Sequence, residues 1–153
     1  MKFMMNGAIT LGTLDGANVE IDALVGRDND VIFGHTVEEL NDMKYSYRAQ
    51  SYIDGDERIA NVLRSLVDCT WSSDPDDFTL ILNEIKNKND EFFVLADFDA
   101  YVKAQEKIEE LYQDKHQWAK MCLVNIAKSG YFSSDRTIGE YAEDIWNAEP
   151  LKF

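Results

Sequence analysis

The chain has 153 residues, of which 45% are hydrophobic and 12% aromatic, enough apolar material for the core of one globular domain. Its 29 acidic residues outnumber 15 basic ones and give a net charge of -14, with no basic cluster to offset it. Polyanions repel such a chain, which excludes DNA, RNA and anionic membranes as expected partners.

Two short apolar segments near the start predict parallel strands. Residues 8–14 and 30–34 are apolar runs bounded by glycine and aspartate, a pattern typical of buried parallel strands. Between them, Val19, Leu24 and Val25 fit one loosely helical face, and Gly26 can end the helix. The segment therefore predicts a strand–helix–strand unit of about 30 residues, near the minimum size for such a crossover.

The rest of the chain predicts helices. Thr36 and Glu39 form a capping box, in which each side chain accepts a hydrogen bond from a backbone amide at the helix start. Asp74, as N-cap before Pro75, predicts another helix start. Helical spacing of apolar residues predicts further helices over residues 57–69, 98–112 and 118–127, and Ser129 and Gly130 end the last of these. A capping box at Thr137 and Glu140 predicts the start of a final helix. Its apolar stripe consists of Tyr141, Ile145 and Trp146.

Two strands followed by helices predict an incomplete α/β domain, because a two-stranded parallel sheet leaves its faces and edges uncovered. We expect the tail of a doubly wound domain whose other strands lie upstream. No apolar run approaches the roughly 20 residues that span a bilayer. Polar residues such as Asn6 and Asp15 also interrupt any signal-like stretch after residues 1–5, so the expected location is the cytoplasm.

The turn from the first strand into the helix, residues 12–17 (GTLDGA), has two interpretations. Glycine-rich turns at this position bind phosphate through amides at the helix N-terminus, although this one matches neither the dinucleotide nor the P-loop pattern. The alternative is a tight structural turn. Asp15 is either a ligand-binding residue at the end of a strand or a cap of the following helix.

Isolated cysteines and histidines indicate no metal site. Cys69 and Cys122 lie in no CxxC or His-paired spacing, which predicts two free thiols. His35 and His116 have no nearby partners in the sequence for zinc. Lys2 is predicted to be a frayed, solvated terminal lysine when composition alone is considered.

Two further groups of residues have alternative interpretations. The tyrosines at positions 45, 47 and 52 either stack on sugars or border the core. Residues 132–136 (FSSDR) suggest either a phosphate or kinase site or a capped turn with a local pair between Asp135 and Arg136.

Residues 1–21 (MKFMMNGAITLGTLDGANVEI) closely resemble the pyridoxal-phosphate segment of the α-glucan phosphorylases. The similarity continues in residues 32–37 (IFGHTV), 96–102 (ADFDAYV) and 132–138 (FSSDRTI), and ends with residues 140–142 (EYA) and 145–146 (IW). It covers essentially the whole chain and is looser over residues 44–89. The chain is therefore expected to be a C-terminal piece of a glycogen or maltodextrin phosphorylase.

The resemblance implies a two-lobed glycosyltransferase architecture (GT-B type) with two Rossmann-like lobes and the active site between them. Residues 1–153 would be the C-terminal part of the second, cofactor-binding lobe, with the first lobe and the upstream half of the second lobe absent. These enzymes cleave α-1,4-glucan with inorganic phosphate and release glucose 1-phosphate, and the phosphate of their pyridoxal phosphate assists proton transfer. Lys2 matches the lysine that binds this cofactor covalently; Asn6, Thr13 and Asp15 match the motif without an assigned role.

The family's glycine-rich loop around the cofactor phosphate and its basic residues for the substrate phosphate have no counterpart in residues 1–153. We therefore expect the chain alone to lack phosphorylase activity and not to retain pyridoxal phosphate. The alternative functions are a non-enzymatic acidic helical interaction module and a regulatory fragment. A homo-oligomer is expected, with self-association driven by apolar residues of the strands (Ile9, Leu11, Val31 and Ile32) and of the last helix.

Overall fold

The computed structural model describes residues 1–149, which form two compact units. The first unit combines Met1–Leu11 and Ala17–Ile32 with the chain from Lys107 onward. The second unit combines Gly12–Gly16 with Phe33–Glu106. Each unit has its own cluster of buried apolar side chains, so each has a core of its own.

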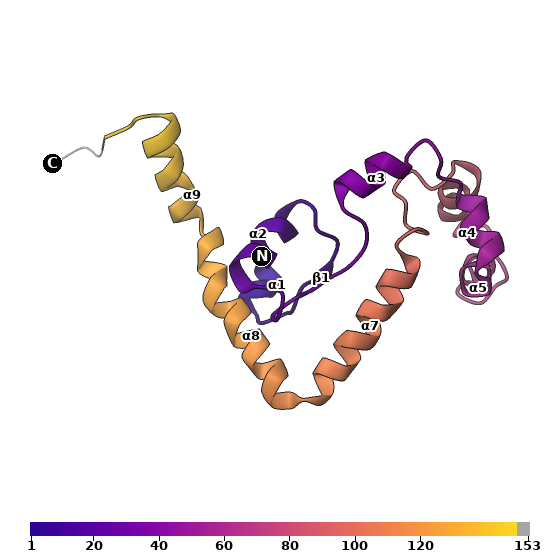
Figure 1. Cartoon of the computed structure of the whole chain (residues 1–153), viewed down its shortest axis with the longest axis horizontal. Helices are drawn as coiled ribbons and strands as arrows, with labels where there is room; N and C mark the ends of the chain where they lie inside the picture. The colour runs from indigo at the N-terminus through magenta and orange to yellow at the C-terminus, as the bar shows by residue number, and fades with distance from the viewer. Residues whose placement is uncertain (150–153) are drawn as a thin grey trace. The chain divides into compact units, whose positions relative to one another are not determined.

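Helices dominate both units (Figure 1). No helix among residues 1–149 has the length and apolar character needed to cross a membrane. In chain order the elements are α1 (Lys2–Met5), β1 (Leu11–Gly12), α2 (Ala17–Val25), β2 (Val31–Ile32), α3 (Val37–Met43), α4 (Ala49–Gly55), α5 (Glu57–Ser65), α6 (Thr79–Leu82), η1 (Asn83–Asn87), α7 (Phe98–Gln113), α8 (Lys115–Ser129), η2 (Gly130–Phe132), α9 (Ser134–Glu140) and η3 (Tyr141–Ile145).

The strands β1 and β2 pair in parallel on either side of α2, which confirms the predicted strand–helix–strand unit. The Val31 N–H donates to the Thr10 carbonyl at 2.9 Å, and the Phe33 N–H donates to the Gly12 carbonyl at 3.1 Å. Both strands are shorter than the predicted residues 8–14 and 30–34, because among the described residues no third strand extends the ladder.

The helix α2 ends where the sequence predicted. Gly26 has a positive φ of 77°, and its N–H donates to the Asp22 carbonyl at 2.8 Å. Glycine adopts this left-handed conformation without the clash that a Cβ would cause. The chain can therefore reverse immediately after Val25 and enter β2.

The core of the first unit forms where α1 and α2 pack on α8. Met4, Ile21 and Val25 are 2%, 5% and 6% exposed, and Val124 and Phe132 pack against them. The α8 residue Asn125 is fully buried, and its side-chain amide donates to the Asn29 carbonyl at 2.8 Å. This bond ties α8 to the turn that precedes β2.

The core of the second unit lies around α4 and α5. Its buried members are Tyr47, Ala49, Ile59, Leu63 and Leu95, with Met43, Tyr52, Phe93 and Phe98 among the half-buried residues packed on them. In α5, Ile59 and Leu63 are four residues apart and so lie on one face of the helix. The predicted helix over residues 57–69 exists, but it ends at Ser65.

Local capping signals placed some helix starts correctly. The capping box at Thr36 is confirmed: the Glu39 N–H donates to Thr36 Oγ1 at 3.3 Å, and the Thr36 N–H donates to the Glu39 carboxylate at 2.7 Å. The hydrogen bond from Thr36 is the main reason that the pKa of the Glu39 carboxyl is lowered. The helices predicted over residues 98–112 and 118–127 correspond to α7 and α8.

Two predicted helix starts were wrong. Asp74 accepts the Asp76 N–H at 2.9 Å and so closes a turn, whereas α6 begins only at Thr79. The last helix begins before the predicted box at Thr137, because Ser133 is the N-cap and accepts the Arg136 N–H at 3.3 Å. Asp and Ser side chains stabilise turns as well as helix starts, so the sequence pattern did not distinguish the two.

The predicted pair between Asp135 and Arg136 was also wrong. Arg136 instead contacts the carboxylate of Glu140, one turn further along the same helical stretch. Adjacent residues on a helix point in different directions, whereas residues four apart face each other. The interpretation of residues 132–136 as a capped turn is nevertheless confirmed by Ser133.

Apolar residues remain exposed at the end of the chain. Tyr141, Ile145 and Trp146 are 45%, 66% and 59% exposed. The expected exposure of the strand residues was wrong for Val31, which is 2% exposed. Exposed apolar side chains on α9 and η3 are consistent with the expected self-association, which stays a prediction.

Candidate functional site

Lys2 begins α1 in the first unit, with its side chain exposed. Met4 of the same helix is buried at 2% exposure and holds α1 in the core, where it packs on α8. The side-chain amide of Asn6 donates to the Lys2 carbonyl at 2.8 Å and so stabilises the end of α1. The prediction of a frayed Lys2 was therefore wrong for the backbone, which is helical, although the side chain is solvated as predicted.

The glycine-rich turn Gly12–Gly16 belongs to the second unit. The Asp15 N–H donates to the Thr13 carbonyl at 3.0 Å, and Gly16 has a positive φ of 47°. Of the two interpretations, a phosphate-binding turn and a tight structural turn, these features fit the structural turn. The Asp15 side chain is exposed and lines two cavities of the second unit.

His35 and Asp97 form a pair that the sequence analysis missed. His35 Nδ1 lies 2.6 Å from Asp97 Oδ1, and the same oxygen accepts the His35 backbone N–H at 2.9 Å. A carboxylate at Nδ1 fixes the orientation of an imidazole ring. Together with Thr13 and Asp15, both side chains line a small cavity of about 100 Å³.

Only the fold brings this pair together, because 62 residues separate its members. His35 follows β2, and Asp97 immediately precedes α7 and accepts the Tyr101 N–H on its carbonyl at 2.8 Å. A signal was present in the sequence: residues 32–37 and 96–102 are both stretches of specific family similarity. The sequence analysis considered His35 only as a zinc ligand and therefore missed its pairing with Asp97.

We expect Gly34→Ala to separate this pair. Gly34 has a φ of 82°, and a Cβ there would lie 2.6 Å from Asp97 Oδ2. The left-handed backbone penalty of about 1–2 kcal/mol and the loss of a hydrogen bond worth about 1 kcal/mol should lower the free energy of unfolding by roughly 2–3 kcal/mol. Urea denaturation measures this change. Gly55→Ala is the matched control, since nothing lies within 4 Å of its added Cβ; equal losses in both variants would contradict the expectation.

A second polar pair, Tyr47 and Asp90, lies beside the core of the second unit. The Tyr47 hydroxyl donates to Asp90 Oδ2 at 2.6 Å, and both residues are buried. Burial, followed by the hydrogen bond to Asp90, raises the pKa of the Tyr47 hydroxyl well above its usual range. Tyr47 and the half-buried Tyr52 therefore belong to the core and its border, whereas Tyr45 is 87% exposed.

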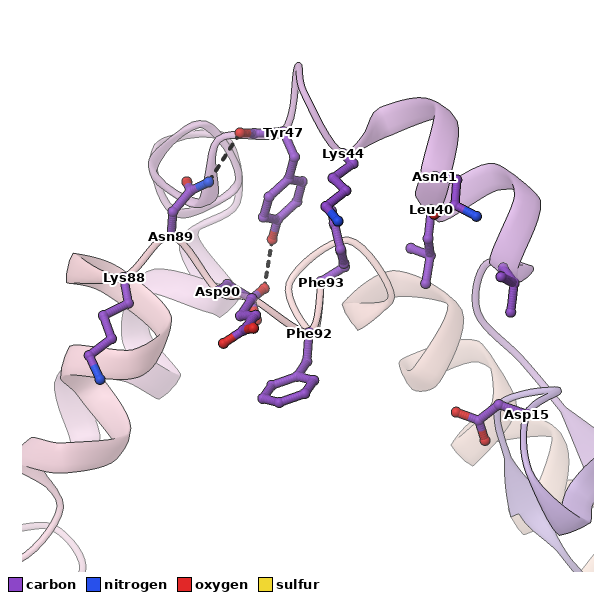
Figure 2. Close-up of a pocket in the computed structure, with 12 residues that line it drawn as sticks. Asp15, Leu40, Asn41, Lys44, Tyr47, Lys88, Asn89, Asp90, Phe92 and Phe93 are labelled. Carbon is purple, nitrogen blue, oxygen red and sulfur yellow. Dashed lines mark hydrogen bonds between the residues drawn. The ribbon is translucent and has the colours of Figure 1, made fainter.

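The pair borders a cavity of about 590 Å³ (Figure 2). Its lining comes from Asp15, from α3 and from residues 88–93, all within the second unit. This volume lies within the range of small-molecule sites, about 300–1,000 Å³. The lining mixes apolar, amide and charged side chains, which suits a polar ligand with an apolar face.

The first unit holds a buried carboxyl group at Asp30. The side chain is 1% exposed, and neither oxygen accepts a hydrogen bond from a donor in the described structure. Burial and the nearby charge of Asp22 raise the pKa of Asp30 to about 6. A cavity of about 420 Å³ beside it is lined by Arg27, Lys107 and Lys120, among others.

The cysteines are free thiols, as predicted: Cys69 is exposed and Cys122 is half-buried. Within residues 1–149, no three His, Cys, Asp or Glu side chains are grouped closely enough to hold a metal ion.

The protein-family model for carbohydrate phosphorylases matches residues 1–148. The chain belongs to the carbohydrate phosphorylase family. It is 46% identical over 153 residues to glycogen phosphorylase of Bacillus subtilis (strain 168), with 99% of this chain and 19% of that protein covered. It is 45% identical over 154 residues to the muscle forms of glycogen phosphorylase from Rattus norvegicus and Homo sapiens, with 99% of this chain and 18% of each relative covered. The chain thus spans about a fifth of the length of these relatives.

Pyridoxal phosphate, which the family resemblance implies, needs an amine that it can reach and groups that hold its phosphate. The exposed side chain of Lys2 meets the first need. The main cavities among residues 1–149 are lined by other residues, and the phosphorylase motif residue Asn6 bonds to the Lys2 backbone instead of extending a cradle. Lys2 therefore offers an exposed amine but lines none of the cavities described above.

Proposed function

We propose that this chain is the part of an α-glucan phosphorylase that supplies the cofactor lysine, Lys2, and forms the C-terminal part of the second lobe. The family match over residues 1–148, with 45–46% identity to glycogen phosphorylases over nearly the whole chain, carries this proposal. The position of Lys2 at an exposed start of a well-anchored helix supports its assignment.

The proposal extends to the complete protein. It would have the two-lobed glycosyltransferase fold, bind pyridoxal phosphate and cleave α-1,4-glucan with inorganic phosphate to give glucose 1-phosphate. A cytoplasmic location and a homo-oligomeric assembly belong to the same proposal, which rests on the resemblance and on relatives that are named glycogen phosphorylases.

The 153-residue chain by itself should not catalyse this reaction. Holding reactants and catalytic groups in place is worth about 7–11 kcal/mol of a barrier. The solvated side chain of Lys2, which lines none of the cavities described above, supports this expectation. The lysine becomes useful only when the rest of a phosphorylase surrounds it.

A chimera tests the proposal. The segment of the Bacillus subtilis glycogen phosphorylase that matches residues 1–153 is replaced by this chain, and the purified chimera is dialysed after incubation with pyridoxal phosphate. We expect retained cofactor absorbance and release of glucose 1-phosphate from maltodextrin within about tenfold of the parent rate, a barrier difference of about 1.4 kcal/mol.

The isolated 153-residue chain, assayed in parallel, should release no glucose 1-phosphate. A folded chimera that neither retains the cofactor nor turns over would refute the proposal and favour the non-enzymatic interaction module. Turnover by the isolated chain would refute the expectation that catalysis needs the rest of the enzyme.

A further inference from the structure

The loop that carries Phe92 has an unusual backbone. Asn89, Asp90 and Phe93 have positive φ angles of 63°, 48° and 58°, although none is glycine. Such conformations cost about 1–3 kcal/mol each and persist only where the surrounding structure fixes them. They concentrate at ligand sites, so their partners in the second unit are informative.

Hydrogen bonds fix this loop on both sides of Phe92. Before it, Asn89 Oδ1 accepts the Ala49 N–H at 2.9 Å, and its amide donates to the Tyr47 carbonyl at 3.2 Å. Asp90 accepts the Tyr47 hydroxyl at 2.6 Å and the Leu95 N–H at 2.8 Å. After it, the Phe93 ring packs on Tyr47 with ring centroids 4.8 Å apart. The core therefore holds the loop rigidly.

This rigid loop presents an apolar ring to solvent. Phe92 is 80% exposed, although residues on either side of it reach the core. Its ring projects away from the loop backbone, and it lines the cavity of about 590 Å³ (Figure 2). Burying a phenylalanine is worth about 1.5–3 kcal/mol, so a rigid loop that keeps one exposed leaves this energy available to a ligand.

The rest of the lining supplies both hydrogen-bond donors and acceptors. Asn41 of α3 offers an amide and Lys44, which follows this helix, offers an ammonium, while Asp15 and Glu91 offer carboxylates. Lys88 also lines the cavity but already pairs with Glu84. The ammonium of Lys44 is outnumbered by the two carboxylates of Asp15 and Glu91, so the lining has a small negative excess that disfavours an anionic ligand and suits a neutral one. A sugar ring meets all these conditions, because it has an apolar C–H face for Phe92 and hydroxyls that both donate and accept.

We propose that the cavity between α3 and the 88–93 loop is a saccharide-binding site, with Phe92 as its stacking platform, for α-1,4-linked glucose oligomers. The choice of sugar rests on the proposed function, since the chain belongs to the carbohydrate phosphorylase family. All the residues that line this cavity belong to the second unit, and Lys2 is not among them.

An NMR titration of the 153-residue chain with maltopentaose tests the site. We expect saturable shifts of backbone amides in residues 41–44 and 88–93. Phe92→Ala should weaken the apparent Kd by at least about tenfold, because the platform is lost. Trp71→Ala is the matched control: this aromatic residue of the same unit is 68% exposed but does not line the cavity, so its Kd should be unchanged.

Absence of saturable shifts, shifts that map to other residues, or an unchanged Kd in Phe92→Ala would each overturn the site. The chimera assay separates this inference from the proposed function. An active chimera with a flat titration refutes the saccharide site alone. A saturable titration with an inactive chimera keeps the site and refutes the parent activity.

Discussion

Lys2→Arg in the chimera is expected to abolish retention of pyridoxal phosphate and to lower phosphorolysis by about 10²–10⁴-fold. The general acid–base catalysis proposed for the cofactor phosphate is typically worth this factor. Arginine keeps the positive charge but offers no amine that can bind the cofactor covalently. The measurements are the absorbance of the dialysed protein and the rate of glucose 1-phosphate release.

The structure indicates that this loss would be chemical and not a failure to fold. Met4 anchors α1 in the core and Asn6 bonds the Lys2 carbonyl, while the Lys2 side chain itself is exposed. The variant should therefore keep the thermal stability of the unsubstituted chimera. Lys86→Arg makes the same exchange at another exposed lysine and should change neither readout. If the Lys2→Arg chimera retained the cofactor after dialysis, Lys2 would not be the residue that binds it covalently.

The features that the sequence predicted well depend on neighbours in the sequence. The capping box at Thr36 needs only Glu39 three residues later, and the end of α2 needs only a glycine at position 26. The same local rules failed at Asp74 and Thr137, where another nearby side chain or turn satisfied the backbone first. Competition between equivalent local signals is decided by packing, which the sequence pattern does not contain.

The candidate sites depended on contacts that no local pattern contains. His35 and Asp97 are 62 residues apart, and Tyr47 and Asp90 are 43 apart. Lys2 was identified through the family resemblance, since composition alone gave a solvated terminal lysine. Phe92 had no signal at all, because its exposure follows from the anchoring of Asn89 and Asp90 by the core.

Amphipathic patterns predicted the apolar faces of the late helices but not what covers them. In α8, Met121 is fully buried, whereas the apolar Ile126 is 43% exposed and the polar Asn125 is buried. A period of about 3.6 residues identifies a face, while burial depends on which element packs there. Asn125 is buried because it bonds the carbonyls of Asn29 and Met121.

Asp30→Asn is expected to stabilise the first unit at neutral pH. The folded protein raises the pKa of Asp30 from its ordinary 3.8 to about 6, mainly because burial disfavours the charged form and then because the Asp22 charge repels it. Arg27 and Lys107 lower the pKa without offsetting these effects. An ionised carboxylate can only accept hydrogen bonds, so Asp30 and Asp22 can hydrogen-bond to each other only when one of them is protonated.

The sign of the pH dependence follows from proton binding. Between about pH 4 and 6 the folded state holds a proton on Asp30 that the unfolded state has lost, so stability falls as the pH rises through this window. At pH 7 the ionised Asp30 lowers the free energy of unfolding by at most about 3 kcal/mol relative to low pH. Asparagine has nearly the same shape without the charge, and its amide can donate to Asp22.

Urea denaturation of the 153-residue chain at about pH 4 and about pH 7 measures this effect. We expect Asp30→Asn to raise the free energy of unfolding by roughly 1–3 kcal/mol at the higher pH and by much less at the lower pH. Asp28→Asn removes the same charge from an exposed position two residues away, and so controls for the reduction of the net charge of -14. If both variants gave the same pH profile, the stabilisation would come from net charge and not from the buried carboxyl of Asp30.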